Sequence, residues 1–481
     1  MAGILKTCGR TVLQVRRADI IILSLIRIEY FRNFHKKMNP FHKSSFWIVA
    51  AVLLFAAFLA LTFAGIYKSG GLCFAGFWFA LAMLVRFNDF SRSFSYTLIV
   101  VACVTSSMYF PEFYLTVNGV QTMVFITPIL QVIMFGMGTQ LTLRDFQGVI
   151  KQPYGVIVGM ILQFTVMPGV ALLLALTFQY PPEIAAGVIL IGCVPVGIAS
   201  NVMNFIAKGN MALAISITLV STMTAPIATP FLMKYLAGQF VEIELLKMTV
   251  GITNLVILPI MGGLMFRTLA SRTIGFRSVA AHLLSFVCTI AVLNGVFAFA
   301  GHTFESLGGQ ILSQIGIFLG LPILGASLLR TLVVHHPDLF NKLLSIFSMI
   351  GLLLTIVIIN AAGRDHLLQI GLLLIFSSLL HNLAGFLFGY WGAKLFRLDE
   401  RSCRTISIEV GLQNGGLASG IALQMGKAAT VGLAPAVFGP LMNITGSSLA
   451  TWWRSRPVPE TVDTENAETE NTPKAAHDKK I

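Results

Sequence analysis

The chain has 481 residues, of which 56% are hydrophobic and only 11% charged, and its mean hydropathy is +0.82. A soluble globular chain carries about 25% charged residues and cannot bury this much apolar surface in one core, so the composition excludes a soluble protein. The net charge of +13 lies mainly between the apolar runs, where Lys and Arg report membrane topology and do not indicate nucleic-acid binding.

Apolar runs of about 20 residues, the length of helix that crosses a bilayer, recur along the whole chain. They predict about fourteen membrane-spanning helices, and therefore an all-α polytopic membrane protein. The expected spans are 46–66, 71–89, 94–113, 119–141, 154–178, 184–206, 213–236, 248–267, 279–301, 310–330, 341–362, 367–395, 406–426 and 432–453.

Lys and Arg concentrate in alternate loops, as expected when those loops lie in the cytoplasm. The first 45 residues contain nine Lys and Arg residues, whereas the opposite loops hold few cations, chiefly Lys68, Arg364 and Lys427. This alternation predicts that both termini are cytoplasmic and that the protein lies in the plasma or inner membrane.

The two ends of the chain differ in character from the apolar middle. Segment 1–45 is typical of a basic helix on the cytoplasmic membrane surface. An organellar transit segment is the alternative, and Met38 is an alternative start. The polar tail 454–481 is rich in Pro, Glu and Thr and is predicted to be disordered.

Glu409, in ISIEVGLQNGGLASGIAL, is the one acidic residue in the interior of a predicted span, since Asp89 and Glu112 lie at the ends of theirs. A charge at mid-membrane costs about 2.5–3.5 kcal/mol on insertion scales, so such a residue indicates a functional site. The same span holds Gln413, Asn414 and several glycines, which favour a break in the helix. A purely structural ion pair between Glu409 and an Arg is the competing interpretation.

A second span, GVILIGCVPVGIASNVMNFIAKGN, has the same character. Pro195 removes a backbone donor, and Ser200 and Asn201 follow the predicted break. An ordinary proline kink with small residues for close packing would explain this span alone. Two interrupted polar spans in corresponding halves of one chain favour a transporter, because unwound backbone at the midplane binds ions and substrates in such proteins.

Other polar residues within spans are weaker signals individually. Gln163 and Thr218 are placed to reach the site, although a Thr hydroxyl usually bonds its own helix. His381 and Asn382 are more typical of hydrogen bonds between packed helices. Asn443 lies in an Asn-Ile-Thr sequence that cannot be glycosylated within a span, and it is expected near the cavity.

Oxygen ligands from Glu, Gln, Asn, Ser, Thr and backbone carbonyls suit a hard cation rather than zinc or iron. With a single carboxylate, a monovalent ion such as sodium fits better than calcium. A proton is the alternative, because burial favours the neutral form of a carboxyl group.

These motifs resemble the bile acid:sodium symporter family. GVILIGCVPVGIASNVMNFIAKGNMAL is similar to the fourth core helix of that family, and ISIEVGLQNGGLASGIAL to the ninth. MFGMGTQLTLRDF, ILQFTVMPG, LLHNLAGFLFGY and NITGSSLATWW are similar to further family segments in the same order. The similarity covers approximately residues 94–270 and 340–453.

The resemblance implies a ten-helix core of two inverted five-helix repeats, with two discontinuous helices that cross at the centre. A panel domain would rock against a core domain, and about four helices would be additional to the core. The implied layout is a basic cytoplasmic segment at 1–45, an extra helix pair at 46–93, a first repeat at 94–236, a second repeat at 247–453 with a helix pair inserted at 279–330, and a tail at 454–481.

By position, the resemblance also implies two sodium sites. The first would comprise Ser200, Asn201, Thr218 and Glu409. The second would comprise Gln163, Glu409, the backbone carbonyls of Val410 and Leu412, and Gln413. The substrate would lie beside Asn201 and Asn414, with Ile198, Met442 and Asn443 also at the cavity.

Three departures from the family pattern bear on these sites. Ala214 stands where many relatives have a Ser ligand, which would weaken the first sodium site or bring in water. Ile198 and Met442 occupy cavity positions that are often polar in relatives, so substrate choice would differ. The extra helix pairs each add an even number of spans, which leaves the orientation of the core unchanged.

The resulting hypothesis is a symporter that imports a small organic anion together with sodium, the anion being bile acid-like, a monocarboxylate or a sulfonate. A proton-coupled or facilitative carrier on the same fold is the alternative, and a non-transporting membrane sensor is a further one. The sequence contains no paired acidic or metalloprotease motif, so no catalytic residue is assigned and an enzyme is not expected. Expected partners are the anion, sodium and membrane lipid, and the oligomeric state is left open.

Overall fold

A computed structural model describes residues 40–87, 94–197, 199–270 and 332–456. The chain divides after Ala102 into two compact units, each of which is described separately below. The inserted helix pair expected at 279–330, Ile198, and most of segments 1–45 and 454–481 lie outside the described residues.

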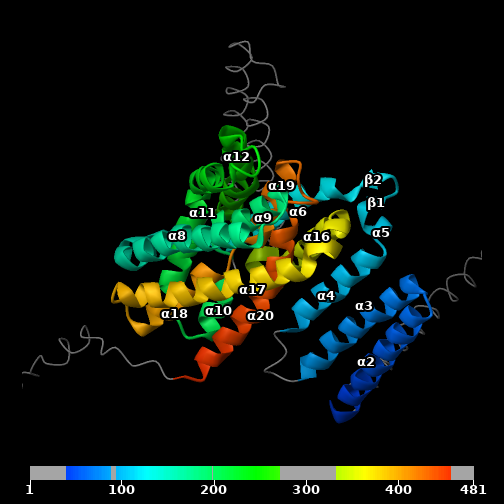
Figure 1. The fold of residues 1–481 in the computed structure, drawn as a ribbon. Helices are drawn as coiled ribbons and strands as arrows, with labels where there is room; N and C mark the ends of the chain where they lie inside the picture. The colour runs from blue at the N-terminus through cyan, green and yellow to red at the C-terminus, as the bar shows by residue number, and fades with distance from the viewer. Residues whose placement is uncertain (1–39, 88–93, 198, 271–331, 457–481) are drawn as a thin grey trace, which may run out of the picture. The chain divides into compact units, whose positions relative to one another are not determined.

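The first unit contains a pair of apolar helices, α2 (Pro40–Phe63) and α3 (Tyr67–Leu84), followed by the 3₁₀ turn η1 (Val85–Phe87). The two helices pack side by side through aromatic rings, and the rings of Phe58 and Phe74 stack with centroids 4.4 Å apart (Figure 1). These helices occupy the pair of spans that the sequence predicted at 46–66 and 71–89.

Helix α4 (Ser95–Tyr109) connects the first unit to the second. It is 15 residues long, shorter than the predicted span 94–113, because Pro111 cannot continue a helix. A small hairpin follows, in which β1 (Thr116–Val117) pairs antiparallel with β2 (Val120–Gln121). Its turn residues Asn118 and Gly119 both have positive φ, as tight hairpin turns require.

The other elements of the second unit that the structure describes are helices. In chain order its elements are α5 (Glu112–Leu115), η3 (Thr122–Phe125), α6 (Ile126–Gln140), α7 (Leu143–Lys151), α8 (Pro153–Phe178), α9 (Pro182–Cys193), α10 (Ala199–Ile206), α11 (Met211–Leu232), η4 (Met233–Ala237), α12 (Leu245–Ile252), η5 (Thr253–Ile257), α13 (Leu258–Ala270), α16 (Pro337–Ala362), α17 (Arg364–Leu395), α18 (Glu400–Gly411), α19 (Gly415–Gln424) and α20 (Leu433–Arg454).

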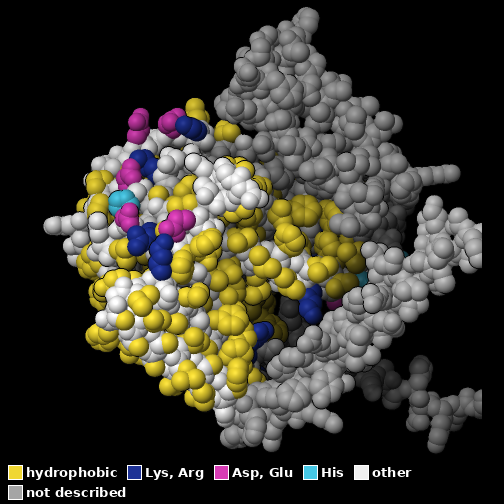
Figure 2. Space-filling model, turned by 90° about the vertical axis from the view of Figure 1, so that its right-hand side faces the viewer, with side chains coloured by type: hydrophobic (Ala, Val, Ile, Leu, Met, Phe, Trp, Pro, Cys, Tyr) yellow, Lys and Arg dark blue, Asp and Glu magenta, His cyan; other side chains and the backbone are white. Residues whose placement is uncertain are grey.

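Eight helices within the described part of the chain are long and apolar enough to cross a membrane. They are Ser44–Phe63, Tyr67–Phe87, Thr122–Gln140, Pro153–Phe178, Met211–Ala237, Leu245–Ala270, Pro337–Ala362 and Arg364–Leu395. Hydrophobic side chains cover much of the described surface that faces the viewer in Figure 2. The protein is therefore an all-α polytopic membrane protein, as the sequence predicted.

Within the second unit, two groups of helices pack tightly. Helix α6 lies against α13 and α16. Helix α17 runs beside α8 and α18, with α20 also packed against it (Figure 1). The assignment of these groups to two inverted repeats, and to a panel and a core domain, stays a prediction.

Two of the predicted spans, 184–206 and 406–426, are each broken into a pair of short helices. Helix α9 ends at Cys193 and α10 begins at Ala199, while α18 ends at Gly411 and α19 begins at Gly415. The sequence predicted both breaks, from a proline in one span and a run of glycines in the other.

The two breaks cross each other as a short antiparallel bridge. The Gly197 N–H donates to the Leu412 carbonyl, and the Asn414 N–H donates to the Pro195 carbonyl, both at 2.9 Å. A Cβ atom at residue 197 would lie 2.6 Å from the Gln413 carbonyl oxygen, so only glycine fits there. The crossing satisfies backbone groups that the breaks would otherwise leave unpaired in an apolar medium.

Candidate cation site at the helix crossing

Glu409 is fully buried in the last turn of α18, directly before the crossing. One carboxylate oxygen accepts a hydrogen bond from the Asn204 amide at 2.7 Å, and the other accepts one from the Thr218 hydroxyl at 2.8 Å. No Lys or Arg of the described residues forms an ion pair with it. Its negative charge is therefore held by neutral donors, which leaves room for a cation to compensate it.

Two oxygen atoms beside this carboxylate are buried without a hydrogen-bond partner among the described residues, the Ser200 hydroxyl and the side-chain carbonyl oxygen of Asn204. The side-chain carbonyl oxygen of Asn201, in the wall of the adjoining cavity, is also buried without a partner among these residues. The Ser200 hydroxyl faces Glu409 without forming a hydrogen bond of normal geometry. Buried polar atoms are almost always paired, so a group of unpaired oxygens around a carboxylate is the arrangement that a bound cation would complete.

The donor set fits sodium in its chemistry. Hydroxyl, amide and carboxylate oxygens from α10, α11 and α18 converge there, and hard cations take oxygen ligands. Of the first predicted site, the structure brings Ser200, Thr218 and Glu409 together. Ala214 lies one turn before Thr218 on α11, is fully buried, and offers no oxygen to the group.

The residues predicted for a second sodium site form a separate cluster of paired amides. The Gln163 amide donates to the Gln413 side-chain oxygen at 2.8 Å and to the Val194 carbonyl at 3.1 Å. In turn, the Gln413 amide donates to the Val410 carbonyl at 2.6 Å and to the Gln163 side-chain oxygen at 3.3 Å.

The remaining member of this predicted set is engaged elsewhere, because the Leu412 carbonyl accepts the crossing bond from Gly197. The structure thus brings Gln163, Val410 and Gln413 together, but the side-chain oxygens of Glu409 bond to Asn204 and Thr218 instead. The idea that Glu409 belongs to both sites stays a prediction.

A cavity of about 240 Å³ reaches the first cluster, and its walls include Asn201 and Thr218. It extends between α6, α7, α11 and α13 to Leu141 and Thr142 in the loop after α6. Asp145 also lines it, and this carboxylate accepts hydrogen bonds from the Thr142 backbone and hydroxyl. Asn201 is the predicted substrate residue that this cavity contains.

The other predicted substrate residues lie apart from this cavity. Asn414 caps α19, with its side-chain oxygen accepting the Leu417 N–H at 3.0 Å, and its amide nitrogen is buried without a partner among the described residues. Met442 is buried, and Asn443 donates within its own helix to the Gly439 carbonyl at 3.1 Å.

Asn204 is the functional candidate that the sequence interpretation missed. It lies one turn after Ser200 in the same quoted motif, so helical spacing places both residues on one face of α10. This four-residue spacing could have identified Asn204 as a candidate from the sequence.

His381 and Asn382 form the contacts between helices that their positions in α17 suggested. The His381 ring nitrogen lies 3.0 Å from the Met167 carbonyl oxygen. Asn382 donates to the Gly411 carbonyl at 2.7 Å and accepts from the Thr445 hydroxyl, which ties α17 and α20 to the end of α18.

The chain is similar in sequence to known transporters. The model of the sodium bile acid symporter family matches residues 127–310. The sodium-dependent transporter YocS of Bacillus subtilis (strain 168) is 33% identical over 366 residues, which are 76% of this chain and 92% of that protein.

Two eukaryotic relatives are similar over somewhat shorter parts. A probable chloroplastic sodium/metabolite cotransporter of Arabidopsis thaliana, BASS1, is 30% identical over 325 residues, which are 68% of this chain and 65% of that protein. The ileal sodium/bile acid cotransporter of Homo sapiens is 25% identical over 296 residues, which are 62% of this chain and 68% of that protein.

The apolar helices, the two crossed breaks and these relatives define a polytopic membrane protein of the sodium-dependent transporter class. More specifically, the chain belongs to the sodium bile acid symporter family. Its named relatives are transporters, in keeping with a sequence to which no catalytic residue was assigned.

Proposed function

We propose that the protein is a sodium-coupled symporter that imports a small organic anion by alternating access. The observation that carries this proposal is the buried carboxylate of Glu409, which accepts hydrogen bonds from neutral donors and lies beside unpaired oxygens of Ser200 and Asn204. A carboxylate in this position remains ionised inside the membrane only if a positive charge compensates it, and the oxygens around it suit sodium.

Sodium would couple to the substrate through the broken helices. Ser200 and Asn204 lie on α10, directly after one break, and Glu409 lies on α18, directly before the other. An ion bound among them would hold the two helices at a fixed distance, and so would hold the crossing between them. Asn201, on the turn between Ser200 and Asn204, lines the adjoining cavity where the anion would bind.

The cavity supports an inward-facing conformation. It runs from the first cluster toward Leu141 and Thr142, in the loop after α6. The Lys and Arg residues near this loop predict that it lies in the cytoplasm. Both termini would lie on that side, in the plasma or inner membrane. The substrate, bile acid-like, a monocarboxylate or a sulfonate, would leave the site by this route.

The number of sodium ions determines how strongly the carrier concentrates its substrate. Two ions with one monovalent anion would move one net charge, worth about 2.3 kcal/mol at 100 mV. With one ion that contribution vanishes, because no net charge crosses the membrane. Ala214 weakens the first site and paired amides occupy the second, so the stoichiometry is the quantity to measure.

Sodium binding to the purified protein tests the proposal directly. A saturable, sodium-dependent rise in thermal stability is expected for the wild type and is expected to be lost in Glu409→Ala. Glu244→Ala is the matched control, because Glu244 is exposed and its one ion pair among the described residues is with Lys247, one helical turn away. If the folded wild type shows no sodium effect, and uptake instead follows pH, the proton-coupled carrier replaces the sodium symporter.

A further inference from the structure

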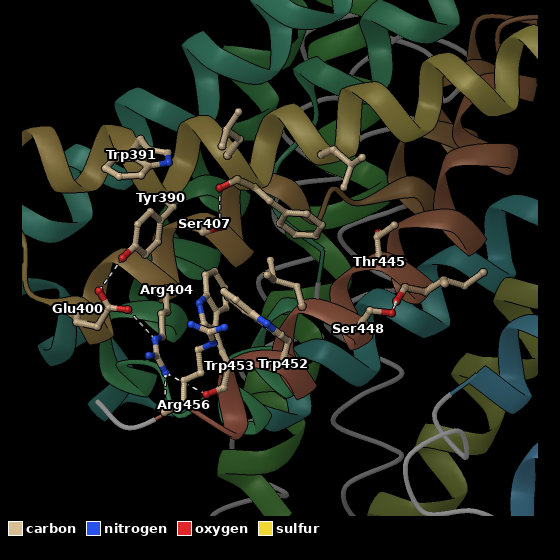
Figure 3. Close-up of a pocket in the computed structure, with 15 residues that line it drawn as sticks. Tyr390, Trp391, Glu400, Arg404, Ser407, Thr445, Ser448, Trp452, Trp453 and Arg456 are labelled. Carbon is tan, nitrogen blue, oxygen red and sulfur yellow. Dashed lines mark hydrogen bonds and ion pairs between the residues drawn. The ribbon is translucent and has the colours of Figure 1, made fainter. Parts of the chain in front are cut away.

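A large groove lies apart from the helix crossing, where the second half of α17, the start of α18 and the second half of α20 meet (Figure 3). Its volume is about 970 Å³. Neither the proposed sodium ligands nor the cavity beside Asn201 contribute to it, so transport of the anion leaves it unexplained.

One end of the groove combines cations with aromatic rings. The guanidinium of Arg456 lies 4.2 Å from the ring centre of Trp452, and that of Arg404 lies 5.8 Å from the ring centre of Trp453. Tyr390 and Trp391 project from α17 at the same end (Figure 3). Trp and Tyr rings beside basic residues mark the level of the lipid headgroups in membrane proteins.

The two arginines have different environments. Arg404 is buried, donates to Glu400 at 2.9 Å, and also donates to the carbonyls of Trp453 and Arg456. Arg456 is exposed, and no ion pair joins its side chain to another described residue. Glu400 balances Arg404, so the described lining of the groove carries one uncompensated positive charge, on Arg456.

The rest of the groove is apolar. Leu383 and Leu387 of α17 face Ile444 and Leu449 of α20 along its length. Ser448 lies between them, and its hydroxyl is satisfied by the Ile444 carbonyl of its own helix at 2.8 Å. The groove therefore combines an apolar wall with a cationic, aromatic end. These two parts are complementary to a molecule with an anionic head and a hydrocarbon tail.

We propose that this groove is a binding site for an anionic glycerophospholipid. The lipid phosphate contacts Arg456 beside the face of Trp452, and an acyl chain lies between Leu387 and Ile444. Basic pockets between membrane-spanning helices recognise anionic headgroups in this way. A second copy of the chain fits less well, because a twofold contact through this face would bring two Arg456 side chains together.

Lipid binding to the purified full-length protein in detergent tests the charged end. Native mass spectrometry would compare dioleoyl phosphatidylglycerol with dioleoyl phosphatidylcholine, which share their acyl chains. The wild type is expected to prefer phosphatidylglycerol, and Arg456→Gln to weaken its binding about fivefold, the effect of one Arg near a membrane surface. Arg454→Gln is the matched control, since Arg454 is the last residue of α20, two positions before Arg456, is exposed and does not line the groove.

The apolar wall has its own test. Leu387→Trp fills the groove and is expected to weaken binding of both lipids, whereas Leu372→Trp, an exposed position of α17 outside the groove, is expected to leave both unchanged. Thermal unfolding of each variant verifies that it is folded.

Four results would overturn the proposal. Equal losses in Arg454→Gln and Arg456→Gln would indicate general surface charge, and equal binding of the two lipids would indicate no headgroup recognition. Binding that appears only after deletion of 457–481 would assign the groove to the chain's own tail. Cross-linking of Ser448→Cys between two copies, with loss of lipid, would assign it to a dimer.

Discussion

The two polar clusters beside the helix crossing differ in what satisfies their oxygen atoms. Around Glu409, a carboxylate meets the unpaired oxygens of Ser200 and Asn204. Around Gln413, amide nitrogens from Gln163 and Gln413 itself already donate to the available carbonyls. In the first cluster no positive charge among the described residues balances the Glu409 carboxylate. In the second cluster all groups are neutral and their hydrogen bonds are satisfied.

This difference shows how one pair of broken helices can leave oxygen atoms available to a cation in one cluster and occupy them with hydrogen bonds in the other. A cation enters the first cluster by adding ligands to oxygens that have spare capacity. In the second cluster it must first displace an amide hydrogen from each carbonyl, at a cost of about 0.5–1.5 kcal/mol per bond. We therefore expect sodium to bind first at Glu409.

The largest effect on sodium affinity is expected from Gly197→Ala, because Gly197 lies in the helix crossing next to both clusters. The new Cβ would lie 2.6 Å from the Gln413 carbonyl oxygen, so the two broken helices must move apart. Overpacking costs about 1–3 kcal/mol, and because the clash here is with backbone we expect the upper end of that range, a fall in sodium affinity of about 100-fold, as measured by sodium-dependent thermal shift. Gly169→Ala is the control, because that position has open space and should tolerate the change. Wild-type sodium binding in Gly197→Ala would show that the crossing does not hold the site.

A smaller effect is expected from Asn204→Ala, which removes a donor from the charged cluster alone. A hydrogen bond to a charged group contributes about 1.5–3 kcal/mol, so sodium binding should weaken roughly 10-fold or more. Asn443→Ala is the matched control, because the Asn443 amide bonds only within α20. Calorimetric titration with sodium measures both. An unchanged affinity in Asn204→Ala would remove Asn204 from the site.

Gln163→Met distinguishes the contributions of the two clusters to sodium binding, because it changes only the second, neutral cluster. Gln163 contacts Gln413 and Val194 but not the Glu409 carboxylate oxygens, so sodium affinity at the first cluster should change less than about threefold. If a second ion binds, the sodium dependence of uptake should become less steep. Gln131→Met, on α6, is the control. Complete loss of sodium binding in Gln163→Met would mean that the second cluster, around Gln163 and Gln413, is the principal sodium site.

The smallest effect is expected from Ala214→Ser, which adds an oxygen to the first cluster. Residue 214 lies one turn before Thr218 and is buried, so a hydroxyl there would point along the same face of α11. A single added ligand should strengthen sodium binding about threefold, within the range for one neutral hydrogen-bonding group. Ala212→Ser, on the same helix, is the comparison. Weaker binding in Ala214→Ser would indicate that the pocket has no room for the hydroxyl.

Much of the fold followed from the sequence, for identifiable reasons. Apolar run length placed the long helices, because the bilayer thickness fixes that length. Pro195 and the glycines after Gly411 predicted both breaks, because each weakens a helix in a known way. Glu409 was identifiable as a candidate site residue from the cost of a charge in an apolar medium.

The finer geometry did not follow from the sequence. Helical spacing places Asn204 on the face of Ser200, but it does not say which helix packs there, so its bond to Glu409 was missed. The mutual pairing of Gln163 and Gln413 depends on the angle between α8 and the crossing, which no local pattern encodes. The groove beside Arg456 arises from the way α17, α18 and α20 pack against one another, and the angles between packed helices are not encoded in a local sequence pattern.

The crossing also has a consequence for the biogenesis of the protein. Its two strands come from opposite halves of the chain, and the nearby bond between Asn204 and Glu409 joins residues 205 positions apart. At ribosomal rates of about 5–20 residues per second, the first broken helix waits roughly 10 to 40 s for its partner. During that interval the backbone groups of Pro195 and Gly197 lie in the bilayer without the bonds that later satisfy them. A nascent chain stalled before α18 is therefore expected to be a substrate for membrane quality control, although all eight of the long apolar helices among the described residues precede that point.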